Sequence, residues 1–199
     1  FLELNKKRHA IKHFTDQPVD PKDVRTAIEI ATLAPSVHNS QPWKFVVVRQ
    51  KNAELAKLAY GANYDQVMEA PVTIALFTDT DLQKRARKIA RVGGVKNFTD
   101  EQLQYFMQSL PAEFARYDAQ QTSDYLALNA GLVAMNLVLA LTDQGIGTNI
   151  ILGFDKEKIN EVLDIEERFR PEVLITVGYA AEKVEPSYRL PVDEIIEKR

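Results

Sequence analysis

The sequence contains no cysteine and only three histidines among its 199 residues. A chain without thiols forms no disulfide, no thiolate metal site and no cysteine nucleophile. The histidines are scattered, so the side chains that usually surround a transition metal are not concentrated anywhere. The composition therefore points away from a metal site and from thiol redox chemistry.

Neither sign of charge is in large excess, because 25 Lys and Arg residues stand against 28 Asp and Glu residues. The net charge of −3 gives no electrostatic footprint for bulk nucleic-acid binding. The basic run at residues 84–91 is therefore interpreted as a solvated helix face. We expect small molecules rather than nucleic acids as partners.

No apolar run is long enough to cross a bilayer comfortably. The longest covers residues 125–141 and is interrupted by Asn129 and Asn136. A helix that is apolar nearly all round is instead buried in a core or between subunits. No secretory signal segment is visible after Phe1, and we expect a cytoplasmic protein with no membrane partner.

The chain also lacks internal repeats, Gly/Ser linkers and a G-x-G-x-x-G dinucleotide fingerprint. Its length is that of one domain, and we expect a single domain over residues 1–199. Helices are predicted at 21–33, 52–60, part of 100–117 and 123–145, with a short helix after Asp155 that ends at 163. Strands are predicted at 43–49, 72–78, 148–152 and 173–179. This alternation favours α/β layers or an α+β fold with a central sheet.

Local signals set several of these boundaries. Asp20 is the expected N-cap of the first helix, with Pro21 at its first position. Ser123 is expected to cap the long apolar helix, and Asp155 the short helix that ends at residue 163. We expect a helix break near Pro111 and the end of the long helix near Gly145.

The segment 34–43 reads Ala-Pro-Ser-Val-His-Asn-Ser-Gln-Pro-Trp and lies between a predicted helix and a predicted strand. Its prolines and short polar side chains continue neither element. A fixed loop rich in donors and acceptors suits a ligand site, since binding residues are often carried on such loops. A well-capped helix-to-strand turn explains the same residues equally well.

Six pieces of the chain, taken in order, resemble the nitroreductase family of flavin enzymes. They are Arg8-x-x-x-Lys12, the loop 34–43, the segment 63–71 that ends in Ala-Pro, the apolar helix 125–141, the Gly-x-Gly strand of 145–153, and Arg189-Leu-Pro. The resemblance implies an α+β sandwich with a central, mostly antiparallel sheet flanked by helices. It also implies a homodimer with FMN at the interface.

The resemblance assigns the FMN phosphate to three cations, Arg8, Lys12 and Arg189, which suit a terminal phosphate. Arg8 and Lys12 share a face if that turn is helical. Ala10 stands where the family often has Ser or Arg, and Ser187 where it often has Lys. We therefore expect weaker FMN retention than in relatives that keep those residues.

The resemblance assigns the flavin ring to amides and to the end of a strand. Asn63 and Gln66 match positions at the pyrimidine edge, although local backbone bonds also explain them, above all Gln66. The backbone N–H groups of Leu152 and Gly153 are expected near N5 and O4 of the ring. The full cofactor-binding set implied is Arg8, His9, Ala10, Lys12, Pro35, Ser36, Val37, Asn39, Asn63, Gln66, Ile150, Ile151, Leu152, Gly153 and Arg189.

The resemblance implies an FMN-dependent oxidoreductase that uses NAD(P)H to reduce nitroaromatic or quinone-type acceptors by a ping-pong mechanism. FMN would be tightly bound and NAD(P)H a transient reductant. His38 is expected at the substrate mouth, and no side chain is assigned a catalytic role because the flavin does the redox chemistry. Alternatives are a specialised flavin enzyme on the same scaffold, such as a reductive dehalogenase, or a low-turnover FMN-binding carrier or sensor.

Overall fold

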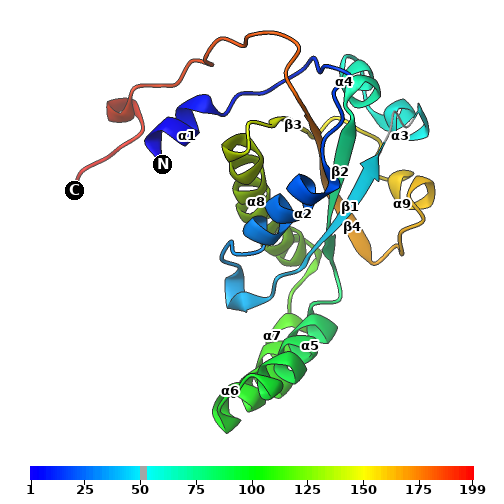
Figure 1. Cartoon of the computed structure of the whole chain (residues 1–199). Coiled ribbons are helices and arrows are strands. Elements are labelled where there is room, and N and C mark those ends of the chain that lie inside the picture. The colour runs from blue at the N-terminus through cyan, green and yellow to red at the C-terminus, as the bar shows by residue number, and fades with distance from the viewer. Residues whose placement is uncertain (50–52) are drawn as a thin grey trace.

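The computed structural model describes residues 1–49 and 53–199 and is built around one four-stranded sheet (Figure 1). The strands are β1 (Trp43–Arg49), β2 (Val72–Asp79), β3 (Gly147–Ile151) and β4 (Phe169–Gly178). Their order is β1-β2-β4-β3, and every neighbouring pair is antiparallel. The predicted α+β fold with a mostly antiparallel central sheet is confirmed.

The strand β4 begins four residues before the predicted boundary at Val173. The extra segment contains Pro171, which has no N–H for the ladder and therefore weakened the prediction. The pairing with β2 shifts between Leu76 and Phe77, so that Leu76 faces Val173 and Phe77 faces Pro171. This irregularity leaves Glu172 as the extra residue and allows the strand to include a proline.

Two helices, α2 (Pro21–Ala31) and α8 (Ala119–Asp143), cover one face of the sheet (Figure 1). The predicted cap of α2 is confirmed, because the Asp20 carboxylate accepts a 2.7 Å hydrogen bond from the Lys22 N–H. Buried residues of both helices and of β2 and β4 form one hydrophobic cluster on this face, including Val24, Leu137 and Ile175.

The predicted N-cap of α8 at Ser123 is wrong, because the helix starts at Ala119. Asp118 and Gln121 form a capping box, which satisfies the free N–H groups one turn earlier. Ser123 lies inside the helix, and its hydroxyl accepts a hydrogen bond of 2.6 Å from Arg170 Nη1. The predicted end is confirmed, since Asp143 is the last helical residue and Gly145 has a φ of +78°.

Among the described residues, α8 is the one helix that is long and apolar enough to cross a membrane by length and composition. The 25-residue helix is longer than the apolar run that indicated it, and 61% of its most apolar window is buried inside the protein. The core helix of a globular protein has the same length and composition, so the feature is weak evidence for a membrane span.

The other face of the sheet is covered by α3 (Ala53–Leu58), α4 (Asn63–Glu69) and α9 (Ile159–Val162). The predicted helix 52–60 is confirmed in its middle, while Asn52 lies outside the described residues. The predicted cap at Asp155 is wrong for α9, which begins at Ile159 with Lys158 at its N-cap position; the Asp155 carboxylate instead accepts hydrogen bonds from the N–H groups of Glu157 and Lys158 in the preceding turn. Leu55, Phe77 and Ile151 belong to the cluster beneath these helices.

A helical hairpin extends beyond one end of the sheet (Figure 1). It consists of α5 (Leu82–Val95), α6 (Asp100–Gln104), the π-helical turn η2 (Tyr105–Ser109) and α7 (Leu110–Phe114). The predicted break near Pro111 is wrong. The Leu110 N–H bonds to the Tyr105 carbonyl five residues earlier, and this widened turn gives the proline ring room inside a continuous helix.

Three short elements complete the chain: α1 (Leu2–Lys7), η1 (Val37–Asn39) and η3 (Val192–Glu194). The first and last belong to terminal segments that extend to the same side of the sheet, near one end of α8 (Figure 1). The middle one lies inside the polar loop 34–43.

Candidate functional site

The two terminal segments, β3 and α8 enclose a surface cavity of about 480 Å³. Arg8 and Arg189, from opposite ends of the chain, both line it, and no Asp or Glu is among its lining residues. The other lining residues are Asn5, Ala10, Met135, Val138, Thr148, Asn149 and Ile150. Two guanidinium groups without a lining carboxylate make this cavity suited to an anion such as a phosphate.

The segment after α1 reaches this cavity in an extended conformation. Arg8 has φ −70° and ψ 117°, Ala10 forms a parallel bridge with Thr148, and the Ile11 N–H donates to the Thr148 carbonyl at 2.9 Å. The condition of a shared helical face for Arg8 and Lys12 is therefore not met. The chain pairs with β3 instead of continuing the helix.

Two of the predicted N-terminal ligands do not line the cavity, since neither His9 nor Lys12 is among its lining residues. The Lys12 side chain is exposed, and its neighbour Ile11 is buried. Ala10 does line the cavity, and its methyl group donates no hydrogen bond there. Of the three cations predicted to bind the FMN phosphate, Arg8 and Arg189 therefore line this cavity and Lys12 does not.

Arg189 differs from Arg8 in its bonding. Its Nη1 donates to the carbonyls of Ser187 at 3.3 Å and Tyr188 at 2.8 Å, so the side chain is folded back on its own exposed segment. Both contacts are local and use one nitrogen, which leaves the other guanidinium nitrogens available to a ligand.

Amide side chains connect α4 to β3 beside the cavity. Asn149 Nδ2 donates to Gln66 Oε1 at 2.5 Å, and Gln66 Nε2 donates to the Ala62 carbonyl at 3.3 Å. Asn63 Nδ2 donates to the Gly153 carbonyl at 3.2 Å. Both ends of the buried Gln66 amide are engaged by the protein, which favours a structural role for this side chain.

Asn149 is a residue of this region that sequence reasoning missed. It lines the cavity and is bonded to Gln66. The available signal was its position inside the otherwise apolar and β-branched strand Gly147–Ile151, where asparagine is disfavoured unless it has a specific partner.

The end of β3 alternates between the core and the surface. Ile151 is only 2% exposed and packs in the hydrophobic cluster under α3 and α9, whereas Ile150 is 43% exposed and Leu152 67% exposed. Of the predicted ring contacts, Ile150 and Leu152 therefore present side chains outward, and Ile151 does not. A Cβ added at Gly153 would lie 2.9 Å from Asn63 Nδ2, so glycine is what allows that amide to approach.

The loop 34–43 is fixed by side chains of α8 some distance from the cavity. The Val37 N–H donates to Asn129 Oδ1 at 2.9 Å, and the Tyr125 hydroxyl lies 2.7 Å from both the Val37 carbonyl and Ser40 Oγ. Burial raises the pKa of Tyr125 to about 12, so its hydroxyl remains a donor at neutral pH.

The predicted cofactor-binding residues therefore form two separate groups within one chain, one in the loop 34–43 and one in the arginine cavity. The loop, with Pro35, Ser36, Val37 and Asn39, is held at residues 125–129 of α8, while the cavity reaches α8 at Met135 and Val138. At 1.5 Å of rise per residue these two places are on the order of 10–15 Å apart along the helix axis. None of the four loop residues lines the arginine cavity.

His38 faces the helical hairpin. Its Nδ1 lies 2.9 Å from the Tyr105 hydroxyl, and its ring centroid is 5.8 Å from that of Phe114 and 6.3 Å from that of Tyr125. The imidazole is thus held at the junction of the loop and the hairpin, next to the π-helical turn that carries Tyr105.

Comparison with known proteins identifies the architecture that carries these two groups. The nitroreductase family matches residues 6–179 of the chain. The chain belongs to the nitroreductase family. The expectation of an oxidoreductase of this family is confirmed.

Relatives of this nitroreductase-family chain span its whole length. A Streptococcus pyogenes protein whose name proposes an NAD(P)H nitroreductase is 66% identical over 199 residues, which is 100% of this chain and 99% of that protein. The crystal structure of a nitroreductase family protein from Streptococcus pneumoniae has a TM-score of 0.97 at 85% identity, with 100% of both chains covered. A proposed nitroreductase of Exiguobacterium sibiricum, solved in complex with FMN, has a TM-score of 0.88 at 29% identity, with 100% of this chain and 97% of that chain covered.

This nitroreductase-family chain also has an apolar groove of about 740 Å³ beside α8. Its lining includes Gly131, Met135, Ile150 and Leu152, so it adjoins the arginine cavity through Met135 and Ile150. The lining further includes the half-buried Arg170, which pairs with Glu172 at 2.8 Å. The groove and the cavity therefore lie next to each other along α8 and β3.

Proposed function

We propose that this protein is an FMN-dependent oxidoreductase that uses NAD(P)H to reduce nitroaromatic or quinone-type acceptors. The observation that carries the proposal is the arginine cavity, in which both ends of the chain supply a cation beside the end of β3. Its neighbour from Exiguobacterium sibiricum, which shares the fold, was solved with FMN.

The residues present fit the phosphate of FMN. Arg8 and Arg189 offer guanidinium groups to an anion carrying a charge near −2, and no lining carboxylate opposes it. Ala10 contributes no donor from its side chain, and Lys12 is outside the cavity. FMN retention therefore depends on two arginines, which supports the weaker retention expected from the sequence.

The residues beside the cavity fit the ring. Asn149 and Asn63 carry the donors and acceptors that a pyrimidine edge requires. The exposed side chains of Ile150 and Leu152 offer an apolar surface to an aromatic plane. When bound, FMN supplies the redox chemistry, and these residues orient it and exclude water from one side of it.

We further propose that the complete site is shared by two copies of this chain, because the loop 34–43 and the arginine cavity do not meet within one. Leu128, Leu132 and Met135 form an exposed apolar stripe on α8, with 56%, 36% and 41% exposure. Exposed apolar stripes of this kind mark interaction surfaces. Pairing along α8 would bring the loop of one protomer to the cavity of its partner.

The proposed reaction sequence is ping-pong. The chain has no dinucleotide fingerprint, so NAD(P)H would bind transiently where the acceptor later binds, with His38 at the entrance to the pocket. A chain without cysteine has no need of an oxidising compartment, which supports a cytoplasmic location.

The experiment is an anaerobic half-reaction study of the protein saturated with FMN. Adding NADH or NADPH without acceptor is expected to bleach the flavin absorbance, and adding a quinone afterwards to restore it. Initial rates at several fixed acceptor concentrations are expected to give parallel double-reciprocal lines. A protein that binds no FMN contradicts the proposal outright, and slow bleaching without turnover would instead support the carrier or sensor alternative.

A further inference from the structure

The loop 34–43 is held in a backbone conformation that its residue types disfavour. His38, Asn39 and Gln41 have φ values of 56°, 49° and 44°, in the left-handed region where glycine is the usual residue. Three such residues within four positions persist only when surrounding contacts determine the conformation. Two of these contacts come from outside the loop, on α5.

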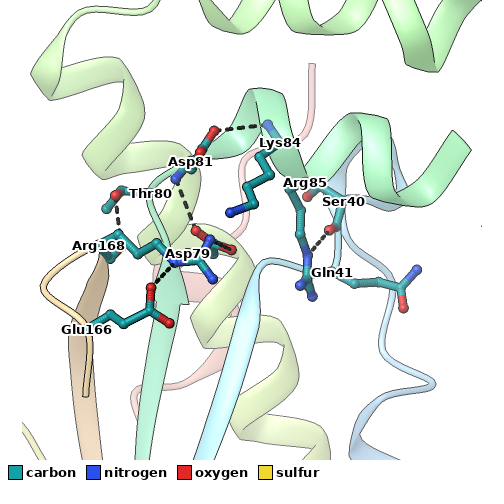
Figure 2. A network of polar contacts seen from close by, with 9 residues as sticks. All are labelled: Ser40, Gln41, Asp79, Thr80, Asp81, Lys84, Arg85, Glu166 and Arg168. Atoms are coloured by element: carbon teal, nitrogen blue, oxygen red, sulfur yellow. Dashed lines mark hydrogen bonds and ion pairs between the residues drawn. The ribbon is translucent and has the colours of Figure 1, made fainter. Parts of the chain in front are cut away.

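Arg85 of α5 binds two consecutive carbonyls of the loop (Figure 2). Its Nε donates to the Ser40 carbonyl at 3.1 Å, and its Nη2 donates to the Gln41 carbonyl. A planar guanidinium that holds two successive peptide oxygens fixes the orientation of both peptide planes. Those planes, Ser40–Gln41 and Gln41–Pro42, lie on either side of the Gln41 Cα, whose φ is positive.

Arg85 serves these carbonyls rather than a carboxylate. Asp79, whose charge acts on Arg85, accepts instead from Arg168 Nη1 at 3.3 Å and from the Asp81 N–H at 3.1 Å (Figure 2). Within the described residues no carboxylate lies within ion-pair distance of Arg85. Burial lowers the pKa of Arg85 and the charge of Asp79 opposes that change, so the guanidinium remains protonated at neutral pH.

Beside Asn39 and Gln41, one side of the loop faces a cavity instead of packed side chains. A cavity of about 340 Å³ lies there, with Asn39 and Gln41 of the loop on one side and Arg85, Lys88 and Phe98 among its other lining residues. On this side of Asn39 and Gln41 the two Arg85 hydrogen bonds act where side chains do not fill the space, and they add to the restraint that Tyr125 and Asn129 give the loop from α8.

We propose that Arg85 is a positioning residue that holds Ser40 and Gln41 so that the strained loop presents Asn39 to the flavin and His38 to the acceptor. The inference rests on the proposed function. Arg85 itself would touch neither the flavin nor the acceptor. Its position also couples the α5–α7 hairpin to the loop, so a displacement of α5 would be transmitted to Asn39.

The test compares the variants Arg85→Met and Arg85→Lys with the parent protein. Methionine keeps a long apolar stem and removes both donors, and lysine keeps the charge but cannot bind both carbonyls in the same plane. Hydrogen–deuterium exchange of the peptide covering residues 34–43 is measured first, without added FMN. We expect exchange roughly tenfold faster in Arg85→Met and an intermediate rate in Arg85→Lys.

The second measurement is FMN affinity by fluorescence titration, together with kcat and KM at saturating FMN. Arg85→Met is expected to bind FMN about tenfold more weakly and to have an altered visible circular dichroism spectrum of the bound flavin. Its melting temperature should stay within a few degrees of the parent value. Arg87→Met, an exposed position on the same helix, is the matched control and should equal the parent in all measurements.

Unchanged exchange of residues 34–43 in Arg85→Met overturns the inference. Faster exchange with parental FMN affinity and parental kcat/KM also overturns it, because the loop would then be loosened without consequence for the site. If Arg85→Met does not fold, the same criteria apply to Arg85→Lys. A parent protein that binds no flavin contradicts the proposed function itself, which the exchange data on the apoprotein distinguish from a failure of Arg85 alone.

Discussion

Asn129 and Tyr125 illustrate how polar residues inside an apolar helix acquire a role that their sequence does not reveal. In the sequence, Asn129 is only an interruption of a hydrophobic run. In the fold its side chain is fully buried, and it accepts from the Val37 N–H while donating to the Tyr125 carbonyl at 2.7 Å. Buried amide groups are nearly always hydrogen-bonded, so a buried Asn129 is expected to have a partner. The identity of that partner, 92 residues away, came only from the fold.

Replacing Arg189 with alanine is expected to weaken FMN binding by about one to two decades, because a charge-assisted hydrogen bond to phosphate contributes roughly 1.5–3 kcal/mol. Equilibrium titration of the apoprotein with FMN measures the effect. Arg199→Ala, in the same exposed terminal segment but outside the cavity, serves as the control. Equal affinities in the two variants would remove Arg189 from the site.

Replacing Tyr125 with phenylalanine is expected to change how stability depends on alkaline pH. The pKa of Tyr125 is raised by burial from 10.0 to about 12 in the folded protein. A raised folded-state pKa gives a contribution that is complete below pH 10 and is lost as the pH rises from 10 through 12. Urea unfolding at pH 9 and pH 11 should therefore show a steeper loss in the parent than in Tyr125→Phe, by on the order of 1 kcal/mol. Equal losses would mean that Tyr125 is not protected from ionisation by the fold.

At the scale of elements, β1 and β2 were predicted better than the start of β4 or the start of α8. The strand β1 has the predicted bounds because its run of β-branched residues lies between clear turn signals. The start of α8 was placed at Ser123 because Ser is a good N-cap, whereas Asp118 with Gln121 forms a reciprocal cap that satisfies two N–H groups. A break at Pro111 is expected because proline usually interrupts a helix, and this expectation does not allow for the π-helical turn Tyr105–Ser109 that accommodates it. In both places several residues act together, which local propensity does not describe.

The junction between the loop and the hairpin provides a test of His38 at this scale. If His38 lines the acceptor pocket, His38→Ala should lower kcat/KM for a quinone and a nitroaromatic several-fold, up to about tenfold, with FMN affinity nearly unchanged. Tyr105→Phe, which removes the hydroxyl that contacts Nδ1, should reproduce part of this effect. The assay uses saturating FMN. Parental rates for both acceptors would place His38 outside the pocket, and loss of FMN would mean that His38 rather than Asn39 supports the flavin.

For the molecule as a whole, the sequence predicted the α+β arrangement, while the fold decides which of the predicted site residues lie together within one chain. Arg8 and Arg189 were brought together as expected, whereas Lys12 was not, because the segment pairs with β3 and turns Lys12 away from the cavity. Asn149 was missed because its importance arises from a contact with Gln66 across elements. The single domain over residues 1–199 and the homodimer stay predictions.

The dimer is expected to have a mass near twice the 22.5 kDa of one chain in light scattering. Leu132→Glu, in the apolar stripe of α8, should shift the protein toward monomer and lower FMN affinity at the same time, since a buried charge in an apolar interface is unfavourable. Val95→Glu, at a site 86% exposed at the far end of α5, is the control and should remain dimeric. A monomer that retains full FMN affinity would contradict a shared site.

The meeting of Arg8 and Arg189 in one cavity has a consequence for how the protein is made. The segment that carries Arg8 is synthesised long before the segment that carries Arg189, with the whole sheet between them in the sequence. The sheet can close once β4 is available, but the anion cavity is completed only when the last segment returns to β3. Contacts of such large sequence separation form late, because closing a long loop costs entropy before any contact offsets it. A nascent chain arrested after β4 should therefore contain a folded sheet with an incomplete anion cavity, and capture of the proposed cofactor would wait for the segment that carries Arg189.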